Sequence, residues 1–356
     1  MNYLDELKRR DSTLDLIRIV AFIGVISVHF FLNSGFYDQI VIGKRMYIMT
    51  ILRSFFMYCV PLFLVLSGFL MNKKKISLSY YIGILRIITI YVLASIFCLT
   101  FKYLKDSILL KDAIVQIFNF SGAPYSWYIE MYIGLFLLIP FLNLAYNGLT
   151  NKKQKQILLV TMIFMTALPS VFNIRIKIIP SWWNLIYPIS YYYIGAYLSE
   201  YPTKLKNKCL LSLLVPYIVL IGSYSYIKSY NQPFVWGSWT NWESIFNVIT
   251  TVLIFNIIKN LNFQNWNLRF KAVIKYISSL TLGAYLLSWI ADQVFYPILL
   301  QRVPDMFLRL EYMGIMILVV CVFSLLMSIV VTFLGNQFTI FIKLNFEKSF
   351  NKKVKS

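Results

Sequence analysis

Ten apolar stretches, each long enough to form a helix that crosses a membrane, occupy most of this sequence. The hydrocarbon core of a bilayer is about 30 Å thick and requires about 20 helical residues. Within that core a single stretch satisfies its backbone hydrogen bonds only as a helix or in a closed barrel. The sequence therefore predicts an all-α, polytopic transmembrane helix bundle, with about ten spans at roughly 14–33, 48–70, 82–101, 126–146, 157–172, 181–199, 209–227, 244–259, 276–298 and 313–335.

The composition supports this fold class. Hydrophobic residues make up 59% of the 356 residues and charged residues 13%, whereas a soluble domain has about half and about a quarter. This excludes a soluble enzyme, a secreted disulfide scaffold and a disordered chain. No polar segment between the spans is long enough for a soluble domain. We therefore expect one integral-membrane domain over residues 1–356.

The net charge of +20 raises the question of nucleic acid as a partner. Of the 34 lysines and arginines, 21 fall in alternate loops and in the two tails, ten in the opposite loops and three within the spans. Basic residues concentrate on the cytoplasmic side of membrane proteins. This distribution predicts that both termini are cytoplasmic, with basic tails at 1–13 and 343–356, and it explains the charge without nucleic acid.

A few ionisable side chains lie inside the predicted spans. Placing a charged side chain inside a transmembrane segment costs free energy on the order of several kcal/mol. Such a side chain therefore usually faces a polar cavity or a partner. The alternative is a structural ion pair, or a long side chain that reaches the membrane surface. The set comprises Arg18, Arg53, Arg86, Glu130 and Asp292, together with His29, the only histidine.

Arg18 and His29 are predicted to share one face of the first helix. Eleven residues separate them, which corresponds to three turns plus about 20° and to about 16 Å of rise. Asp15 lies on the same face and is expected to pair with Arg18. A single histidine in an apolar helix is often a structural residue, but this placement favours His29 as a general base.

The charged side chains fall into two groups by their predicted depth in the membrane. Arg18 and Arg86 lie near the cytoplasmic side, with Ser67 at a similar depth, and two arginines there can hold phosphates. His29, Arg53, Glu130 and Asp292 lie in the outer half. This arrangement suits transfer from a cytosolic phosphate-bearing donor to an outer acceptor. Most tryptophans also map to the outer side, where they can stack on sugars or form an interfacial belt.

The second span carries two local signals. Pro61 has no backbone N–H and should kink the helix. The pair Ser67-Gly68 permits another backbone to approach closely near the cytoplasmic end. Ordinary helix packing would explain both signals equally well.

Several segments resemble the bacterial acyltransferase-3 family of membrane O-acyltransferases. The resemblance begins with LDLIR at 14–18 and the spacing from Arg18 to His29, and continues with VPLFLVLSGFL at 60–70. Arg86 stands where the family has an arginine at the start of the third helix. Weaker similarities are SWY at 126–128 with Tyr132 and Pro140, YIG at 193–195 and GAYL at 283–286. Family members often carry a histidine after this last segment, whereas Ser288 occupies the region here.

The resemblance implies a multi-pass enzyme of the bacterial plasma membrane that takes an acyl group, usually acetyl, from acetyl-CoA without a metal. It implies a cell-surface, capsular or exo-polysaccharide, or a lipid-linked oligosaccharide, as the acceptor. Within this scheme His29 is expected to be catalytic, with Glu130 or Asp292 orienting its ring. The donor is expected to contact Arg18, Arg86 and Ser67, and the acceptor Arg53, Trp127 and Tyr128.

Two other functions are compatible with a bundle of this size. A polysaccharide transporter or polymerase also has about ten spans, intramembrane arginines and outer aromatic residues. A structural partner of an envelope synthesis complex would need no charges inside its spans. The combination of Arg18 and His29 with the Ser67-Gly68-Phe69 segment favours acyl transfer over both.

Overall fold

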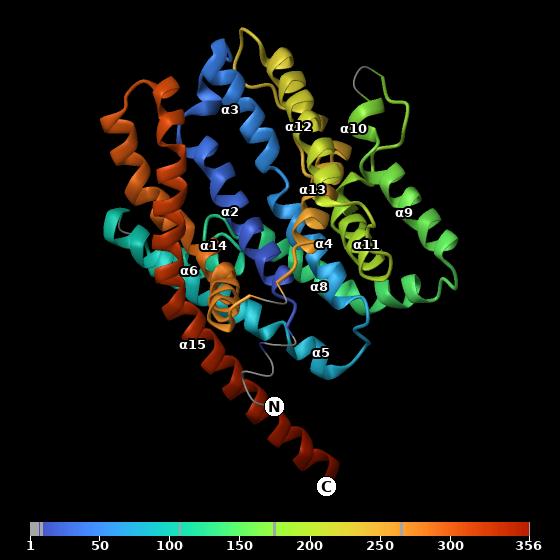
Figure 1. Cartoon of the computed structure of the whole chain (residues 1–356). Helices are drawn as coiled ribbons and strands as arrows, with labels where there is room; N and C mark the ends of the chain where they lie inside the picture. Colours follow the sequence, from blue (N-terminus) through green and yellow to red (C-terminus); the bar gives the residue numbers. More distant parts are fainter. Residues whose placement is uncertain (1–6, 8–9, 107, 174–175, 264–265, 356) are drawn as a thin grey trace. The chain divides into compact units, whose positions relative to one another are not determined.

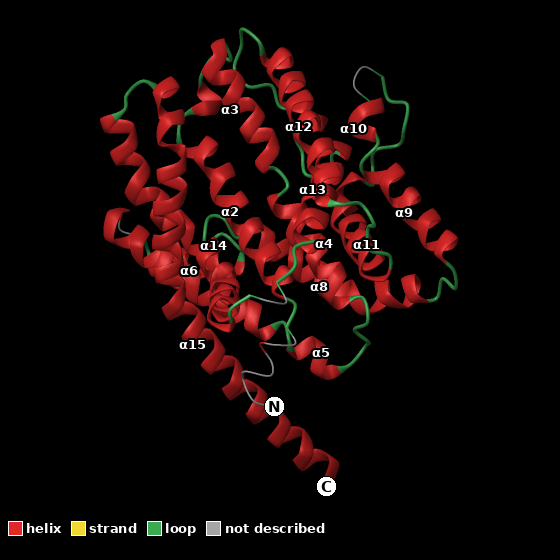
Figure 2. Cartoon of the chain, viewed as in Figure 1, coloured by secondary structure: helices red, strands yellow, loops and turns green. Residues whose placement is uncertain are grey.

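The computed structural model describes residues 7, 10–106, 108–173, 176–263 and 266–355, with side chains up to residue 342. The described part is helical and contains no strand, only two isolated β-bridges, Ile40 with Pro233 and Val41 with Tyr230 (Figure 2). This confirms the predicted all-α fold. Within the predicted basic tails, 1–13 and 343–356, residues 1–6, 8–9 and 356 lie outside the described residues, and the helix over 343–355 is described without its side chains.

Nine helical segments of the described chain are long and apolar enough to cross a membrane. The predicted sixth span, 181–199, contains instead the short helix α11 (Tyr187–Glu200), preceded by η2 (Asn184–Ile186). Nine crossings would place the two termini on opposite sides of the membrane and ten on the same side, so the predicted orientation of both termini depends on α11. The nine segments are Ser12–Asn33, Gly43–Met71, Leu78–Asp106, Trp127–Asn147, Lys152–Phe172, Asn207–Ser229, Ser238–Lys259, Leu268–Arg302 and Met306–Ile342.

The chain forms two compact units that alternate along the sequence. The first comprises Met1–Lys73, Asn143–Ser278 and Tyr296–Leu318, and the second comprises Lys74–Leu142, Ser279–Phe295 and Val319–Ser356. Apart from the boundary after Lys73, the boundaries fall inside α8 (Trp127–Asn147), α14 (Leu268–Arg302) and α15 (Met313–Lys355), which contribute to both units.

In the first unit, α11 packs along α4 (Cys59–Met71), and α2 (Ser12–Asn33) lies against α4 as well (Figure 1). α12 (Asn207–Ser229) packs on α3 (Gly43–Phe56) and on α13 (Ile245–Lys259). α9 (Lys152–Thr166) contacts α11, and α10 (Pro169–Phe172) contacts η3 (Ser238–Thr240). The turn η1 (Phe36–Asp38) follows α2, and η4 (Met306–Tyr312) lies against α3.

Pro61 divides the second span. The span consists of α3 and α4, which are separated at Met57 and Tyr58. Met57 is four residues before Pro61, so its carbonyl is the one that loses a helical N–H donor. The kink predicted from the sequence therefore occurs, and it falls one turn before the proline.

Gly68 and Gly195 bring the backbones of α4 and α11 into direct contact. A Cβ atom on Gly68 would overlap the carbonyl oxygen of Tyr192, and one on Gly195 would overlap that of Val65. Small residues allow helices to approach this closely in membranes. The close approach predicted for Gly68 is confirmed, and its partner is α11.

In the second unit, α5 (Leu78–Ile82) precedes α6 (Leu85–Asp106), α7 (Leu110–Phe118) and α8 (Trp127–Asn147). Tyr80 stacks on Phe136 at 4.5 Å between ring centroids and donates a 2.6 Å hydrogen bond to the Phe136 carbonyl. Ser328 of α15 donates a hydrogen bond to the Leu280 carbonyl of α14. Gly335 of α15 lies against Ile90 of α6. Small side chains thus let α15 pack closely on two helices of this unit.

The Gly68–Gly195 crossing can be tested with Gly195→Ala. Because the added methyl group has no space, we expect the first unit to lose about 3 kcal/mol of stability, as for an overpacked core. Thermal unfolding of the detergent-purified protein should show a lower midpoint. Gly134→Ala is the matched control, since nothing lies within 4 Å of a Cβ at this helical glycine. Equal midpoints for the two variants would contradict the close crossing.

Candidate functional site

Arg18 and His29 lie on one uninterrupted helix. α2 runs from Ser12 to Asn33, and Asp11 caps its start by accepting a hydrogen bond from the Thr13 N–H. Both side chains are half-buried. Regular helical geometry places them on the same face, so the spacing argument made from the sequence applies to this helix.

A charged cluster surrounds Asp15 in the first turn of α2. Arg10 binds this buried carboxylate with two hydrogen bonds, Nε to Oδ2 at 2.5 Å and Nη2 to Oδ1 at 2.8 Å. Ser278 donates to Oδ1 at 2.9 Å and accepts a 2.9 Å hydrogen bond from Arg18 Nη1. Arg18 Nη1 is 3.7 Å from the same carboxylate oxygen. The predicted pair of Asp15 and Arg18 is present, but Arg10 is the closer partner.

A second ion pair stands beside this cluster. Lys259 Nζ lies 2.6 Å from Asp11 Oδ2 and links the end of α13 to the start of α2. Partial burial by itself would raise the pKa of Asp11, but the hydrogen bonds from Lys259 and Thr13 outweigh it and lower the pKa. Arg10, Arg18 and Lys259 thus gather at one end of α2 around Asp11 and Asp15. About one-third of the Arg18 side chain, 32%, is exposed there.

His29 and Arg53 lie at a similar depth in the first unit. Gly24 of α2 packs directly against Tyr58 and Cys59, at the junction of α3 and α4. His29 follows Gly24 by five residues, and Arg53 precedes Tyr58 by five, in consecutive helices that run in opposite directions (Figure 1). Each step is about 7.5 Å of helix rise. The Nδ1 atom of His29 is shielded from solvent.

Arg53 is enclosed by aromatic rings and has only weak hydrogen bonds. Its side chain is 1% exposed. The guanidinium lies 4.8 Å from the ring centroid of Phe234 and 4.9 Å from that of Trp236. Nε donates to the Tyr37 hydroxyl at 3.2 Å, and Nη1 donates to the Thr240 carbonyl at 3.3 Å. Arg53 is therefore held mainly by cation–π contacts.

Ser67 lies within α4, half-buried, and its hydroxyl donates to the Phe63 carbonyl at 2.9 Å. This bond within the helix satisfies the donor, while the oxygen can still accept. Phe69, two residues further on, packs against Phe255 of α13 at 5.4 Å between centroids.

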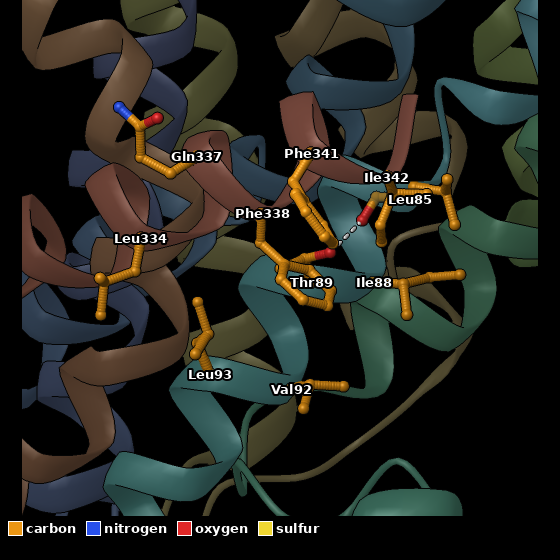
Figure 3. Close-up of a pocket in the computed structure, with 10 residues that line it drawn as sticks. All are labelled: Leu85, Ile88, Thr89, Val92, Leu93, Leu334, Gln337, Phe338, Phe341 and Ile342. Carbon is orange, nitrogen blue, oxygen red and sulfur yellow. Dashed lines mark hydrogen bonds between the residues drawn. The ribbon is translucent and has the colours of Figure 1, made fainter. Parts of the chain in front are cut away.

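In the second unit, Arg86 lies in the first turn of α6 and is exposed. Its Nε donates a 3.0 Å hydrogen bond to the Asn336 side chain of α15. An apolar groove of about 650 Å³ runs between the same two helices, and Figure 3 shows Phe338 and Phe341 lying over Thr89. Its lining is Leu85, Ile88, Thr89, Val92, Leu93, Leu334, Gln337, Phe338, Phe341 and Ile342. The lining of this groove contains none of the charged residues that the sequence predicts for the site.

Asp292 is the buried acid of the second unit, with 1% exposure. The Tyr125 hydroxyl donates a 2.8 Å hydrogen bond to its Oδ2. Tyr285 in turn donates to the Tyr125 carbonyl and lies edge-on to Tyr128, 6.1 Å between centroids. Asp292 and Tyr128, two residues predicted for the site, are thus linked by packed tyrosines.

Trp127 and Glu130 lie near this tyrosine cluster in sequence but are exposed. Trp127 stands edge-on to Tyr128 at 6.2 Å. Within the described residues the carboxylate of Glu130 has no hydrogen bond or ion pair. Of the two acids predicted to orient His29, only Asp292 occupies a buried, hydrogen-bonded position.

The predicted residues thus fall into two groups. Arg18, His29, Arg53 and Ser67 belong to the first unit; the remainder, Arg86, Trp127, Tyr128, Glu130 and Asp292, belong to the second. A single active site that uses members of both groups stays a prediction. In the described part of the chain, no group of three or more His, Cys, Asp or Glu side chains can hold a metal ion.

The similarity to known proteins agrees with this helical arrangement. A family model described as an acyltransferase domain matches residues 11–335, almost the entire chain. The chain belongs to the acyltransferase-3 family. It is therefore a membrane acyltransferase with multiple candidate spanning helices. Neither a curated protein nor a solved structure matches it.

Sequence reasoning missed several contacts of these acyltransferase residues. From the sequence, Arg10 belongs only to the predicted basic tail, and Ser278 and Tyr125 belong to no motif. The signal for Arg10 was its position five residues before the buried Asp15. Ser278 and Tyr125 are distant in sequence from the acids they bind, so no local pattern indicated them.

The Asp15 cluster can be tested by removing its charge. Asp15→Asn keeps the shape but leaves Arg10 and Arg18 without their carboxylate, which should cost about 3 kcal/mol for a buried pair. Asp11→Asn is the matched control, because its ion pair is more exposed and asparagine is also a good N-cap. The midpoint of thermal unfolding should fall more for Asp15→Asn. The opposite order would show that the cluster is not important for stability.

Proposed function

We propose that this acyltransferase transfers an acetyl group from cytosolic acetyl-CoA to a hydroxyl of a cell-surface, capsular or exo-polysaccharide, or of a lipid-linked oligosaccharide. Its location would be the bacterial plasma membrane. The observation that carries the proposal is the placement of Arg18 and His29 on one face of α2, in a chain whose family is established. A basic cluster lies at one end of this face and an imidazole at the other.

The inner end of α2 supports a phosphate-bearing donor. Three cationic side chains, Arg10, Arg18 and Lys259, lie at this end of the helix around Asp11 and Asp15. Guanidinium groups bind phosphates through paired, charge-assisted hydrogen bonds. Arg86 is proposed for the same role because of the resemblance and its exposed guanidinium, and Ser67 as an acceptor of a hydrogen bond from the donor.

His29 is proposed as the general base. Its neutral imidazole takes the proton of the acceptor hydroxyl while the oxygen attacks the thioester carbonyl. The C–S bond then breaks, and the imidazolium returns the proton to the CoA thiolate. His29 lies about 16 Å along the helix from Arg18, a distance that the extended pantetheine arm of CoA spans.

The second unit is proposed to contribute the orienting acid and an aromatic surface. Asp292 suits the first role better than Glu130 because it is buried and already held by Tyr125. A carboxylate bonded to a histidine ring fixes its tautomer and stabilises the imidazolium. Trp127 and Tyr128 are proposed to stack on the acceptor sugar.

The proposal is tested most directly with purified protein in liposomes. Acetyl-CoA hydrolysis or acetyl transfer supports an acyltransferase acting on this donor, whereas a transporter or polymerase would show neither. In parallel, the envelope glycan of a deletion strain should lose its ester-linked acetyl groups. An unchanged acetyl content in that strain would exclude the proposed acceptor class.

His29→Ala provides the test of the base. Loss of the proton acceptor should lower acetyl transfer by about 10²- to 10⁴-fold, the usual contribution of general base catalysis. The measurement is the rate of acetyl transfer by a variant that reaches the membrane and unfolds at the wild-type temperature. Full activity in this variant would rule out His29 as the base.

The donor site is tested by Arg18→Ala and Arg86→Ala. Removing one charge-assisted contact should raise the KM for acetyl-CoA by about 10- to 100-fold. Lysine keeps the charge but loses the paired hydrogen bonds, so the Arg→Lys variants should recover only part of the affinity. Unchanged KM values in both alanine variants would refute this assignment.

A further inference from the structure

We propose that Arg53 binds a carboxylate group of the acceptor. The enzyme then acts on an acidic glycan, and a sugar of this glycan stacks on Trp236. This inference rests on the proposed function and names its acceptor class. It is carried by the surroundings of Arg53, which combine a buried guanidinium, aromatic rings and a lack of acidic partners.

The positive charge of Arg53 lies against aromatic rings and not against a carboxylate of the described residues. Among the described residues, no acidic side chain forms an ion pair with it, and Nη2 makes no hydrogen bond. A buried charge without a partner costs several kcal/mol by general estimates. Such a charge inside a membrane span marks a binding site by default, and the missing partner is an anion.

Arg309 of the same unit shows how this protein satisfies the hydrogen-bond donors of a structural arginine. It is similarly buried, and it donates to the carbonyls of Val303, Ser34 and Pro304 at 2.8, 2.6 and 2.8 Å. All three of its nitrogens are used. Arg53 uses two nitrogens, at 3.2 and 3.3 Å. The difference indicates that Arg53 keeps hydrogen-bonding capacity for a ligand.

A loop between α12 and α13 covers Arg53. Trp236 of this loop is 59% exposed, yet its ring lies over the guanidinium. Tyr37 stacks on Trp236 at 4.8 Å between centroids, with 29° between the ring planes. The indole thus contacts Arg53 and Tyr37, while much of the Trp236 side chain is exposed. A pyranose ring can stack on such a surface, and a rotation of Trp236 exposes the guanidinium.

The geometry favours a carboxylate attached directly to a sugar ring. A uronic acid that replaces Tyr37 or packs beside it on the indole carries its carboxylate within reach of the guanidinium, only 4.9 Å from the Trp236 centroid. The planar fork of arginine matches the two carboxylate oxygens. The loop also offers a second donor, because Trp239 Nε1 is buried and has no hydrogen-bond partner among the described residues.

The test compares two forms of the glycan extracted from the producing cells. One is untreated, and in the other the carboxyl groups are reduced to hydroxymethyl groups. Acetyl transfer to each form gives a ratio of kcat/KM values. We expect the wild type to prefer the untreated glycan by about tenfold or more, the effect of one charge-assisted contact. Arg53→Gln should bring this ratio close to one, and Arg53→Lys should give an intermediate value.

Arg309→Lys is the matched control. It perturbs a second buried arginine in the same unit, but the preference for the untreated glycan should remain. A wild-type enzyme that acetylates both forms equally would overturn the proposal. So would a preference that disappears only after phosphodiesters are removed from the glycan, because the recognised anion would then be a phosphate.

A binding measurement separates this inference from the proposed function. Quenching of tryptophan fluorescence by the untreated glycan needs no turnover, and it should be weaker with the reduced glycan and in Trp236→Phe. If acetyl-CoA is never consumed but this charge-dependent quenching is present, the proposed function fails and the carboxylate site stands. If acetyl transfer occurs without charge dependence in either assay, the site at Arg53 is wrong and the proposed function stands.

Discussion

Every charge inside this protein must be compensated by the protein itself, because hydrocarbon supplies neither water nor counter-ions. The first unit shows three solutions. Asp15 is held by two arginines and a serine. Arg309 is saturated by backbone carbonyls. Arg53 is enclosed by aromatic rings and keeps unused donors. The first two stabilise the fold, and the third is the proposed carboxylate site.

The positions of these groups depend on how tightly the helices pack. Gly68 and Gly195 bring α4 and α11 into backbone contact, and α2 packs on the same helix α4. Gly24 packs against the break between α3 and α4 and so fixes the position of α2 along its axis relative to these helices. Through this contact His29 and Arg53 reach a similar depth. Close helix packing at these glycines thus determines where the charged side chains lie.

Much of this arrangement was predictable from the sequence. Apolar length identified the spans, helical periodicity placed Arg18 and His29 on one face, and Pro61 and Gly68 indicated a kink and a close approach. These signals are local, since each depends on residues within a few turns. The partners of Asp15, Arg53 and Asp292 come from distant segments, and no local pattern encodes which serine or tyrosine will meet them. The sixth span was misjudged in length because Asn184–Ile186 forms a separate short turn before α11.

The short helix α11 has a consequence for how the protein is made. Its 14 residues extend about 21 Å, less than the thickness of the hydrocarbon core. Tyr191, Tyr192 and Tyr193 are buried, and two of their hydroxyls bond to the Trp242 carbonyl and the Asn143 side chain. These bonds require segments on both sides of α11 in the sequence. During synthesis the partner of Tyr192 is therefore present before α11, whereas the hydrogen bond of Tyr191 can form only after Trp242 has left the ribosome.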